Sequence, residues 1–401
     1  MKKGYQTKTL DQISTNLDNR RVPITKGVRA SGEYPYYGAS GIVDYVVDYI
    51  FDEDTLLISE DGANLLARST PIAFPASGKY WVNNHAHILK FENLTTQRFV
   101  ELYLESIPLD DYITGAAQPK LNQKALNSIP IPVPPLPEQE RIVGILDEAF
   151  DGIATAKANA GKNLNNARAL FESHLQSVFT QRGPGWEETT LEMVLAVQPQ
   201  NGWSPPAANH SASGTPVLTL SSVTGFRFRP AKRKFTSAAT DSRRNYWIKN
   251  GDFLITRSNT PELVGHVAIA TGITEPTIYP DLIMRMNPAP DRMMTEFLYF
   301  QMRSPALRKE IMGRAQGANP TMKKISNGAV KTLPIAVPPI ATQRAIVETM
   351  NALTEETQRL ARLYERKLAA LDALKKSLLH QAFSGQLTMD HGQRAMRKSV
   401  S

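Results

Sequence analysis

The chain has 401 residues, of which 41% are hydrophobic and 21% charged, a composition typical of a folded protein with two or more domains. Its formal net charge of +8 favours a polyanionic partner, although many basic proteins bind no nucleic acid. It contains no cysteine, which excludes disulfides, iron–sulfur clusters and cysteine-based zinc sites.

The N-terminal segment carries lysines without an apolar run behind them, so we expect no signal peptide. No stretch approaches the length of apolar sequence that crosses a bilayer. We therefore expect a cytoplasmic protein that contacts no membrane.

Residues 5–128 have the pattern of a mixed α/β half-domain. Strand-like runs rich in β-branched residues cover 42–47, 55–59 and 87–91, and glycine-containing turns separate them. A helix is predicted over 96–105.

A proline-rich segment, 130–137, follows this half-domain. Because proline fixes φ and cannot donate a hydrogen bond to a helix or a β-ladder, we expect a rigid extended bridge there. A long helix is predicted over 137–180, and Gly183-Pro184-Gly185 ends it.

The same order of elements returns in 186–332. Strands are predicted at 216–220, 252–256 and 266–270, and a helix at 295–303. The second half of the chain therefore repeats the plan of the first.

A second long helix is predicted over 341–383, where Gly385 ends it and 386–401 forms a loose tail. Each long helix begins in the same motif, because 129–143 returns as 333–347, 204 positions later. Two similar units in one chain predict a molecule with pseudo-two-fold symmetry.

The apolar positions of the two long helices match at the same shift, with spacings mostly of four and three residues, as in a coiled-coil seam. The seam residues predicted for the first helix are Ile142, Leu146, Ile153, Leu164 and Phe171. Those predicted for the second are Ile346, Met350, Leu353, Leu360, Leu368, Leu371, Leu374 and Leu378. A lone helix of this length with an apolar stripe is unstable in water, so we expect the two seams to pair antiparallel. The alternative is that each helix packs on its own half-domain.

Motifs of catalysis are missing. No Pro-Pro pair precedes an aromatic residue, as a DNA amino-methyltransferase would require, and there is no Gly-x-x-x-x-Gly-Lys-Ser/Thr phosphate loop. His85 and His87 resemble a metal pair on one strand face, but no further ligand follows at a suitable spacing, so we expect no metal site. The acidic cluster Asp52-Glu53-Asp54 is interpreted as a solvated turn rather than a nuclease site.

Residues 227–257 form a basic segment, in which nine lysines and arginines face two aspartates and alternate with aromatic residues. This pattern is typical of a surface that follows phosphates, although a solvated face is the alternative. The candidate DNA-binding residues of this half are Arg227, Arg229, Lys232, Arg233, Lys234, Arg243, Arg244, Arg257 and Asn259.

The first half-domain offers a polar loop-and-strand region instead. Its candidates are Arg68, Lys79, Tyr80, Asn83, Asn84 and His85. Asparagine can recognise adenine edges, and arginine or lysine can recognise guanine. The alternative for any one of them is a structural role, such as a loop-capping asparagine or a buried histidine.

Several motifs together resemble the specificity subunits of Type I restriction–modification systems. The first are the two Pro-Pro-x-x-x-Gln bridges, Pro134-Pro135 with Gln139 and Pro338-Pro339 with Gln343, each followed by a long helix. The others are the segments 36–41, 81–87, 117–120, 250–257, 317–320 and 381–387. The resemblance covers residues 5–387.

The resemblance implies an α+β fold: two mixed α/β target-recognition domains separated by two long helices that form an antiparallel coiled coil. The implied boundaries are 1–136 for target-recognition domain 1, 137–182 for the central spacer helix, 183–338 for target-recognition domain 2, 339–385 for the distal spacer helix and 386–401 for a flexible tail.

The resemblance also implies that each domain recognises one half of a bipartite, asymmetric site in double-stranded DNA while the helices set the spacing. Groove geometry favours half-site centres about one helical turn, roughly 34 Å, apart. Two modification subunits would dock and methylate adenine with S-adenosylmethionine, and restriction subunits would translocate and cut with ATP and Mg²⁺. This chain itself would bind no cofactor and no metal and would not be catalytic alone.

Two other hypotheses stay open at this point. A non-catalytic coiled-coil adaptor or an RNA-binding module would also have long helices, but two equivalent ends would not need half-domains that differ so much in sequence. A self-sufficient nuclease or methylase is disfavoured by the missing motifs.

Overall fold

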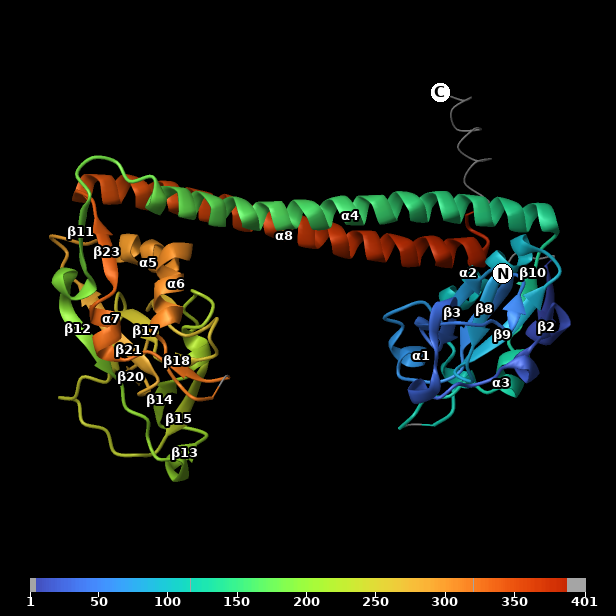
Figure 1. The fold of residues 1–401 in the computed structure, drawn as a ribbon, viewed down its shortest axis with the longest axis horizontal. Helices are drawn as coiled ribbons and strands as arrows, with labels where there is room; N and C mark the ends of the chain where they lie inside the picture. The colour runs from blue at the N-terminus through green and yellow to red at the C-terminus, as the bar shows by residue number, and fades with distance from the viewer. Residues whose placement is uncertain (1–4, 116, 320, 388–401) are drawn as a thin grey trace. The chain divides into compact units, whose positions relative to one another are not determined.

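The computed structural model describes residues 5–115, 117–319 and 321–387, which are drawn in Figure 1. Helices and strands alternate along both halves of the chain, so the predicted α+β class is confirmed. Within the described ranges, no helix has an apolar stretch long enough to span a membrane.

The chain divides into two compact units: unit 1 comprises 1–161 and 365–401, and unit 2 comprises 162–364. Two 45-residue helices, α4 (Leu136–Thr180) and α8 (Ile340–Ser384), each contribute one half to each unit. Each of the two long helices is thus divided between the units.

Unit 1 is built around two four-stranded sheets. The first has the order β2-β9-β6-β7, with β2 (Ser14–Asn16), β9 (Ala86–Phe91), β6 (Thr55–Ser59) and β7 (Ala73–Ala76), all antiparallel. The second has the order β4-β3-β8-β5, with β4 (Gly41–Val46), β3 (Ser31–Gly38), β8 (Lys79–Val82) and β5 (Phe51–Asp52). In the second sheet only β3 and β8 run parallel.

Unit 2 repeats this topology. Its first sheet has the order β12-β21-β17-β19, with β12 (Leu195–Asn201), β21 (Ile283–Pro288), β17 (Phe253–Thr256) and β19 (Val267–Ile269), again antiparallel. Its second sheet has the order β13-β15-β14-β20-β16, with β13 (His210–Ser211), β15 (Arg233–Thr236), β14 (Thr215–Leu218), β20 (Thr277–Ile278) and β16 (Trp247–Ile248). Here β14 and β20 run parallel, as β3 and β8 do in unit 1. The two units therefore share one fold despite their different sequences.

Short helices and 3₁₀ turns (η) complete each unit. Unit 1 contains η1 (Leu10–Gln12), η2 (Asp18–Arg20), η3 (Lys26–Val28), α1 (Asn64–Ala67), α2 (Leu94–Ser106), η4 (Asp110–Tyr112) and α3 (Gln123–Asn127). Unit 2 contains η5 (Leu191–Val194), η6 (Ala207–Asn209), η7 (Leu220–Ser222), α5 (Thr295–Arg303), α6 (Pro305–Arg314) and α7 (Asn327–Lys331). A two-residue pair, β18 (Ser258–Asn259) with β22 (Lys323–Lys324), lies beside the sheets of unit 2.

Both proline bridges form β-strands. β10 (Pro130–Val133) pairs with β1 (Gln6–Thr9), and β23 (Pro334–Val337) pairs with β11 (Glu187–Thr190). Each ladder has only two strands, and prolines occupy alternate positions of β10, so a missing N–H costs little there. The bridges are extended, as expected, but they are paired rather than free.

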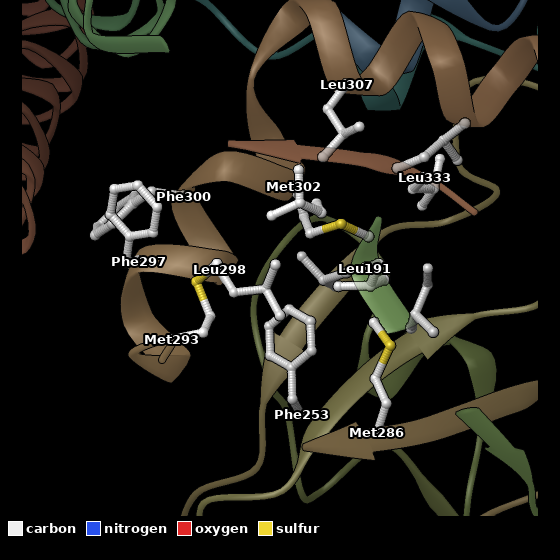
Figure 2. Packing of buried hydrophobic residues seen from close by; sticks show 14 of the residues in the cluster. Leu191, Phe253, Met286, Met293, Phe297, Leu298, Phe300, Met302, Leu307 and Leu333 are labelled. Carbon is white, nitrogen blue, oxygen red and sulfur yellow. The ribbon is translucent and has the colours of Figure 1, made fainter. Parts of the chain in front are cut away.

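The cores explain why these segments fold. Unit 2 buries a large cluster in which Phe253 of β17, Met286 of β21 and Phe297 of α5 pack together, as Figure 2 shows. α5 occupies the predicted range 295–303, and β6 in unit 1 occupies the predicted range 55–59 with all five residues buried. Strong apolar periodicity makes such elements predictable from sequence.

In unit 1, α4 and α8 pack antiparallel. Leu146 of α4 shares a buried cluster with Leu379 of α8 and with Phe99 of α2. Lys157 of α4 lies 2.7 Å from Asp372 of α8. The N-terminal half of α4 therefore pairs with the C-terminal half of α8.

In unit 2, the other halves of the helices pair in the same way, because Phe171 of α4 and Met350 of α8 belong to one core. Of the predicted seam residues, Ile142, Leu146, Ile153, Phe171 and Met350 are buried, and Leu164, Ile346, Leu353, Leu360, Leu368, Leu371 and Leu378 are half-buried. Leu374 does not belong to the seam, because 46% of it is exposed; Leu379 is buried instead.

Candidate DNA interface

The basic segment of unit 2 lies on its second sheet and on the loop that follows β15. In Figure 1 the strands β13, β14 and β15 lie at the end of unit 2 that is farthest from its helices. Lys234 on β15 is exposed, whereas the neighbouring Arg233 is half-buried, pairs with Glu275 at 2.7 Å and lies over the ring of Phe235. Successive residues of a strand point to opposite faces, which separates these two cations.

The loop between β15 and β16 presents its arginines to solvent. The side chains of Arg243 and Arg244 are 89% and 72% exposed, and both face the single carboxylate of Asp241, at 3.2 and 3.9 Å. Hydrogen bonds from the Arg243 side chain and backbone hold the pKa of Asp241 below its usual range. One carboxylate cannot neutralise two guanidinium groups, so the loop keeps a positive charge.

A cavity of about 750 Å³ opens beside this loop. Its lining includes Arg244, Trp247, Lys249 and Arg285, and we call it the basic basin. Arg285 is committed to the fold, because its guanidinium lies 3.5 Å from Asp252 and donates to the carbonyl of Trp247. Arg244 and Lys249 are exposed and available for a ligand.

The other candidate residues of unit 2 differ in their exposure to solvent and in their hydrogen bonds within the fold. Arg229 is half-buried and donates to the carbonyls of Ser221 and Thr224. Arg227 and Lys232 are exposed, and Arg257 and Asn259 are half-buried. The structure thus brings Arg244 of the basic segment to the basin and directs Arg229 into the fold.

In unit 1, Asn84 and His85 lie at the surface in the turn that joins β8 to β9, and Lys79 is exposed at the other end of β8, where that strand begins. The imidazole Nδ1 of His85 lies 2.8 Å from a carboxylate oxygen of Asp61. The ammonium of Lys79 lies 4.7 Å from the ring centroid of Tyr49. This surface is less basic than that of unit 2.

The remaining candidates of unit 1 point inward. Arg68 is half-buried and donates to the carbonyls of Leu104 and Ile107 at the end of α2, and burial lowers its pKa. Tyr80 is fully buried, and burial raises its pKa to about 12. Asn83 is also buried, and its side chain accepts a hydrogen bond from the backbone N–H of His85.

The two histidines considered as a metal pair have separate environments. His85 lies in a turn at the surface, whereas His87 lies in β9 and is 1% exposed. His87 uses Nδ1 toward Asp18 at 2.5 Å and Nε2 toward the carbonyl of Leu121 at 2.7 Å. They do not share a strand face as expected, because β9 begins only after His85.

The buried carboxylates beside His87 are also paired. Glu60 forms ion pairs with Arg21 and Lys120, and Asp18 contacts Arg21 at 3.5 Å. Burial would raise the pKa of both carboxyl groups, but the hydrogen bonds from these partners and from His87 outweigh it and lower both. Asp18, Glu60 and His87 are close enough to hold a metal ion, but the carboxylate of Glu60 is already paired with two cationic side chains, Arg21 and Lys120.

In the acidic cluster near β5, Asp52 and Asp54 are exposed, as a solvated turn predicts, whereas Glu53 is ion-paired. Glu53 lies 2.5 Å from Arg20 and 2.6 Å from Lys90, and its side chain is 17% exposed. The hydrogen bond from Lys90 is the largest of the influences that lower the pKa of Glu53. Sequence alone could not show this, because both partners are more than 30 residues away.

Sequence reasoning missed two cations of a second cavity in unit 2. Arg314 and Lys324 line it together with Arg257, which was predicted. Lys249, which lines the basic basin, was counted in the basic segment but not singled out. The signal for Lys324 was its place four residues after the 317–320 motif, whereas nothing local marks Arg314.

These features define a protein with two domains of one topology, different polar surfaces and a shared pair of antiparallel helices, basic enough to bind a polyanion. The family model for the Type I restriction modification DNA specificity domain matches residues 2–163 and 184–365. The chain therefore belongs to this family, and the resemblance stated from its sequence is confirmed.

Individual relatives agree with the family. S.HindORF215P of Haemophilus influenzae, named as a type I restriction enzyme specificity subunit, is 27% identical over 347 residues, 86% of each chain. The EcoKI specificity subunit of Escherichia coli is 25% identical over 318 residues, which cover 75% of this chain and 68% of the relative.

Solved structures share the fold. A chain from a study of complex assembly and conformational transition of the type I R-M system has a TM-score of 0.71 at 17% identity, covering 96% of this chain and 98% of that one. The HsdS subunit of Thermoanaerobacter tengcongensis has a TM-score of 0.57 at 16% identity, with the same coverage. The predicted two-domain fold with long helices is thereby confirmed.

Family membership makes this chain a specificity subunit, which recognises DNA and is not itself the catalyst. DNA and other subunits of a Type I restriction–modification system are its partners. The adaptor and RNA-binding alternatives are not favoured.

Proposed function

We propose that each unit recognises one half of a bipartite, asymmetric DNA site, and that α4 and α8 set the spacing of the two halves. The observation that carries this proposal is the repeated topology: two domains whose strand orders correspond, apart from the added β13 of unit 2, present different residues on corresponding sheets. Two copies of one fold with different surfaces suit two unrelated sequences, whereas identical surfaces would suit a palindrome.

The recognition surfaces follow from exposure and charge. In unit 2 the proposed DNA contacts are Arg227, Lys232, Lys234, Arg243, Arg244, Lys249, Arg257 and Asn259. In unit 1 they are Lys79, Asn84 and His85. Arginine and lysine would contact phosphates or guanine, and asparagine would contact adenine. Arg68, Tyr80 and Asn83 are left out because their side chains serve the fold.

The catalytic steps would belong to partners. Two modification subunits would methylate adenine with S-adenosylmethionine, and restriction subunits would use ATP and Mg²⁺. The helices, together with the adjoining domains, would form the docking surface for these subunits. The recognition domains would keep the boundaries 1–136 and 183–338, with the spacer helices at 137–182 and 339–385.

A domain exchange tests the proposal. Residues 186–332 are replaced by the corresponding segment of another specificity subunit, and the adenines methylated by the assembled complex are sequenced. The half-site recognised by unit 2 should change, while the other half-site and the gap stay the same. A change in both half-sites, or in neither, would contradict one-domain, one-half-site recognition.

A further inference from the structure

The cavity formed by Arg257, Arg314 and Lys324 in unit 2 has the chemistry of an anion site. It measures about 440 Å³, and no aspartate or glutamate is among the described residues that line it. Its other lining residues are Gln316, Gly317, Ile325, Ser326 and Ala329. Three cationic side chains around one concavity create a positive potential that favours an anion.

Arg257 has a buried donor that the fold leaves unused. Its Nε is buried and has no hydrogen-bond partner among the described residues. Arg314, by contrast, donates to Thr332 at 3.0 Å and lies 3.3 Å from Glu310. A buried guanidinium N–H without an acceptor is costly, so the group at this position is prepared for an acceptor that comes from outside.

The equivalent position in unit 1 is neutralised internally. The carbonyl of Glu60 accepts from the N–H of Leu121 at 2.8 Å, and the carbonyl of Arg257 accepts from the N–H of Ile325 at 2.9 Å, so Glu60 and Arg257 correspond. In unit 1 the Glu60 carboxylate lies 3.0 Å from Lys120. In unit 2, Arg257 stands where unit 1 has this carboxylate. Lys324 therefore has a second cation as its neighbour instead of an acid, and the net charge at this position is positive.

Local structure holds Arg257 in place. It directly follows β17, whose entry turn is fixed by Asp252: one carboxylate oxygen accepts from the backbone N–H of Lys249 and the other from the side chain of Asn287. The backbone N–H of Arg257 donates to Leu282 at 2.8 Å. The guanidinium therefore sits on a rigid strand end, which suits a precise contact.

We propose that Arg257, Lys324 and Arg314 bind a phosphate oxyanion. Arginine offers a planar fork that matches two oxygens of a phosphate, and lysine adds a compact charge. A backbone phosphate of bound DNA and free inorganic phosphate carry this chemistry alike. The choice of DNA as the source rests on the proposed function, whereas the anion site itself does not.

The test uses the specificity subunit assembled with its modification subunits, in four forms: the parent, Arg257→Gln, Lys324→Gln and Lys323→Gln. Lys323 is the matched control, because it is adjacent on β22 but is not among the residues that line the cavity, and its ammonium donates to the carbonyl of Gly317. Arg257→Lys is added as a variant that keeps the charge. The melting temperature without phosphate reports whether each variant folds.

The first measurement is the salt dependence of DNA binding. One lost phosphate contact reduces the slope of log K against log salt by about 0.9. We expect this loss for Arg257→Gln and for Lys324→Gln, but not for Lys323→Gln or Arg257→Lys. The second measurement is the rise in melting temperature on adding inorganic phosphate without DNA, which both glutamine variants of the cavity should lose.

The outcomes distinguish a DNA phosphate from free phosphate, and they distinguish failure of the anion site from failure of the proposed function. A smaller slope of log K against log salt in the two glutamine variants of the cavity supports a DNA phosphate, whether or not these variants also lose the rise in melting temperature on adding inorganic phosphate. If these variants lose the rise in melting temperature on adding phosphate but keep the parent's salt slope, the result supports a site for free phosphate. If neither measurement changes, or if Lys323→Gln behaves like the cavity variants, the site is refuted. A parent complex that shows no salt-dependent DNA binding refutes the proposed function, while the phosphate measurement still decides on the site.

Discussion

Gln139 and Gln343 make the same side-chain hydrogen bond at the starts of α4 and α8. The Nε2 of each donates to a proline carbonyl five residues earlier, Pro134 at 2.8 Å and Pro338 at 2.9 Å. Both glutamines are buried. The Pro-Pro-x-x-x-Gln motif therefore fixes the angle between each proline strand and the helix that follows it.

The two glutamines differ in their remaining bonds, and this difference can be measured. Gln343 also donates to the carbonyl of Arg292 and accepts from the N–H of Met294, both at 2.8 Å. Leaving one buried polar group unpaired costs about 1–3 kcal/mol, so Gln343→Met should destabilise unit 2 by roughly 3 kcal/mol or more.

Gln139→Met in unit 1 serves as the comparison. It removes one bond to Pro134 and should cost only about 1–3 kcal/mol. Urea unfolding followed by hydrogen exchange at the start of each helix gives both values. Equal losses would show that the extra bonds of Gln343 contribute nothing.

The stability of unit 2 should depend on pH through His266. Burial, with a smaller effect of Arg308, lowers the pKa of His266 to about 4, and its Nδ1 accepts from the N–H of Gly225 at 2.9 Å. The unfolded chain takes up this proton near pH 6.5, but the folded unit does not. Stability from this group is therefore complete above about pH 6.5 and is lost as the pH falls toward about 4.

Thermal unfolding of the parent and of His266→Gln, from neutral pH down to about 4, tests this dependence. The melting temperature of the variant should fall less over this range than that of the parent. His85→Gln is the control, since the side chain of His85 is 48% exposed. If the parent and His266→Gln have parallel curves, His266 does not supply the dependence.

The exposed arginines of the β15–β16 loop should contribute to DNA affinity. We expect Arg243→Glu and Arg244→Glu, made singly in the assembled complex, to weaken binding and to lower the salt slope by about 0.9 each. Lys309→Glu on α6 makes the same charge change at an exposed position outside the basic segment. Filter binding over a salt series supplies the slopes, and an unchanged slope would remove the loop from the interface.

The helices should set the gap between half-sites. One heptad inserted into α4 after Gly161 and one into α8 after Tyr364 keeps the seam in register and adds about 10 Å. The gap between methylated adenines should grow by about three base pairs. Sequencing of methylated DNA gives this gap directly.

A complex that still methylates the original spacing would rule out the helices as the spacing element. An insertion into α4 alone is the control, because it shifts one seam against the other. That variant should lose assembly or folding rather than acquire a new gap.

The sequence by itself determined the repeated plan and the long helices. Apolar residues at spacings of three and four define a helix locally, and α5 was predicted to its ends for this reason, whereas β6 was predicted from its short run of β-prone residues between turns. The family was identified in the same way, because its motifs are contiguous stretches such as 36–41 and 250–257. The first forms the hairpin between β3 and β4, with Gly41 at a φ of 109° that favours glycine.

Tertiary structure alone decided which cations are free. In the sequence, Arg68 and Arg243 are both simply arginines. The carbonyls that accept hydrogen bonds from Arg68 belong to Leu104 and Ile107, 36 and 39 residues away. The same holds for the cavity of Arg257, since Arg314 and Lys324 reach it only through the pairing of β18 with β22 and the placement of α6. Local periodicity encodes elements, whereas the partners of a charged side chain depend on contacts between distant segments, which exist only once the chain has folded.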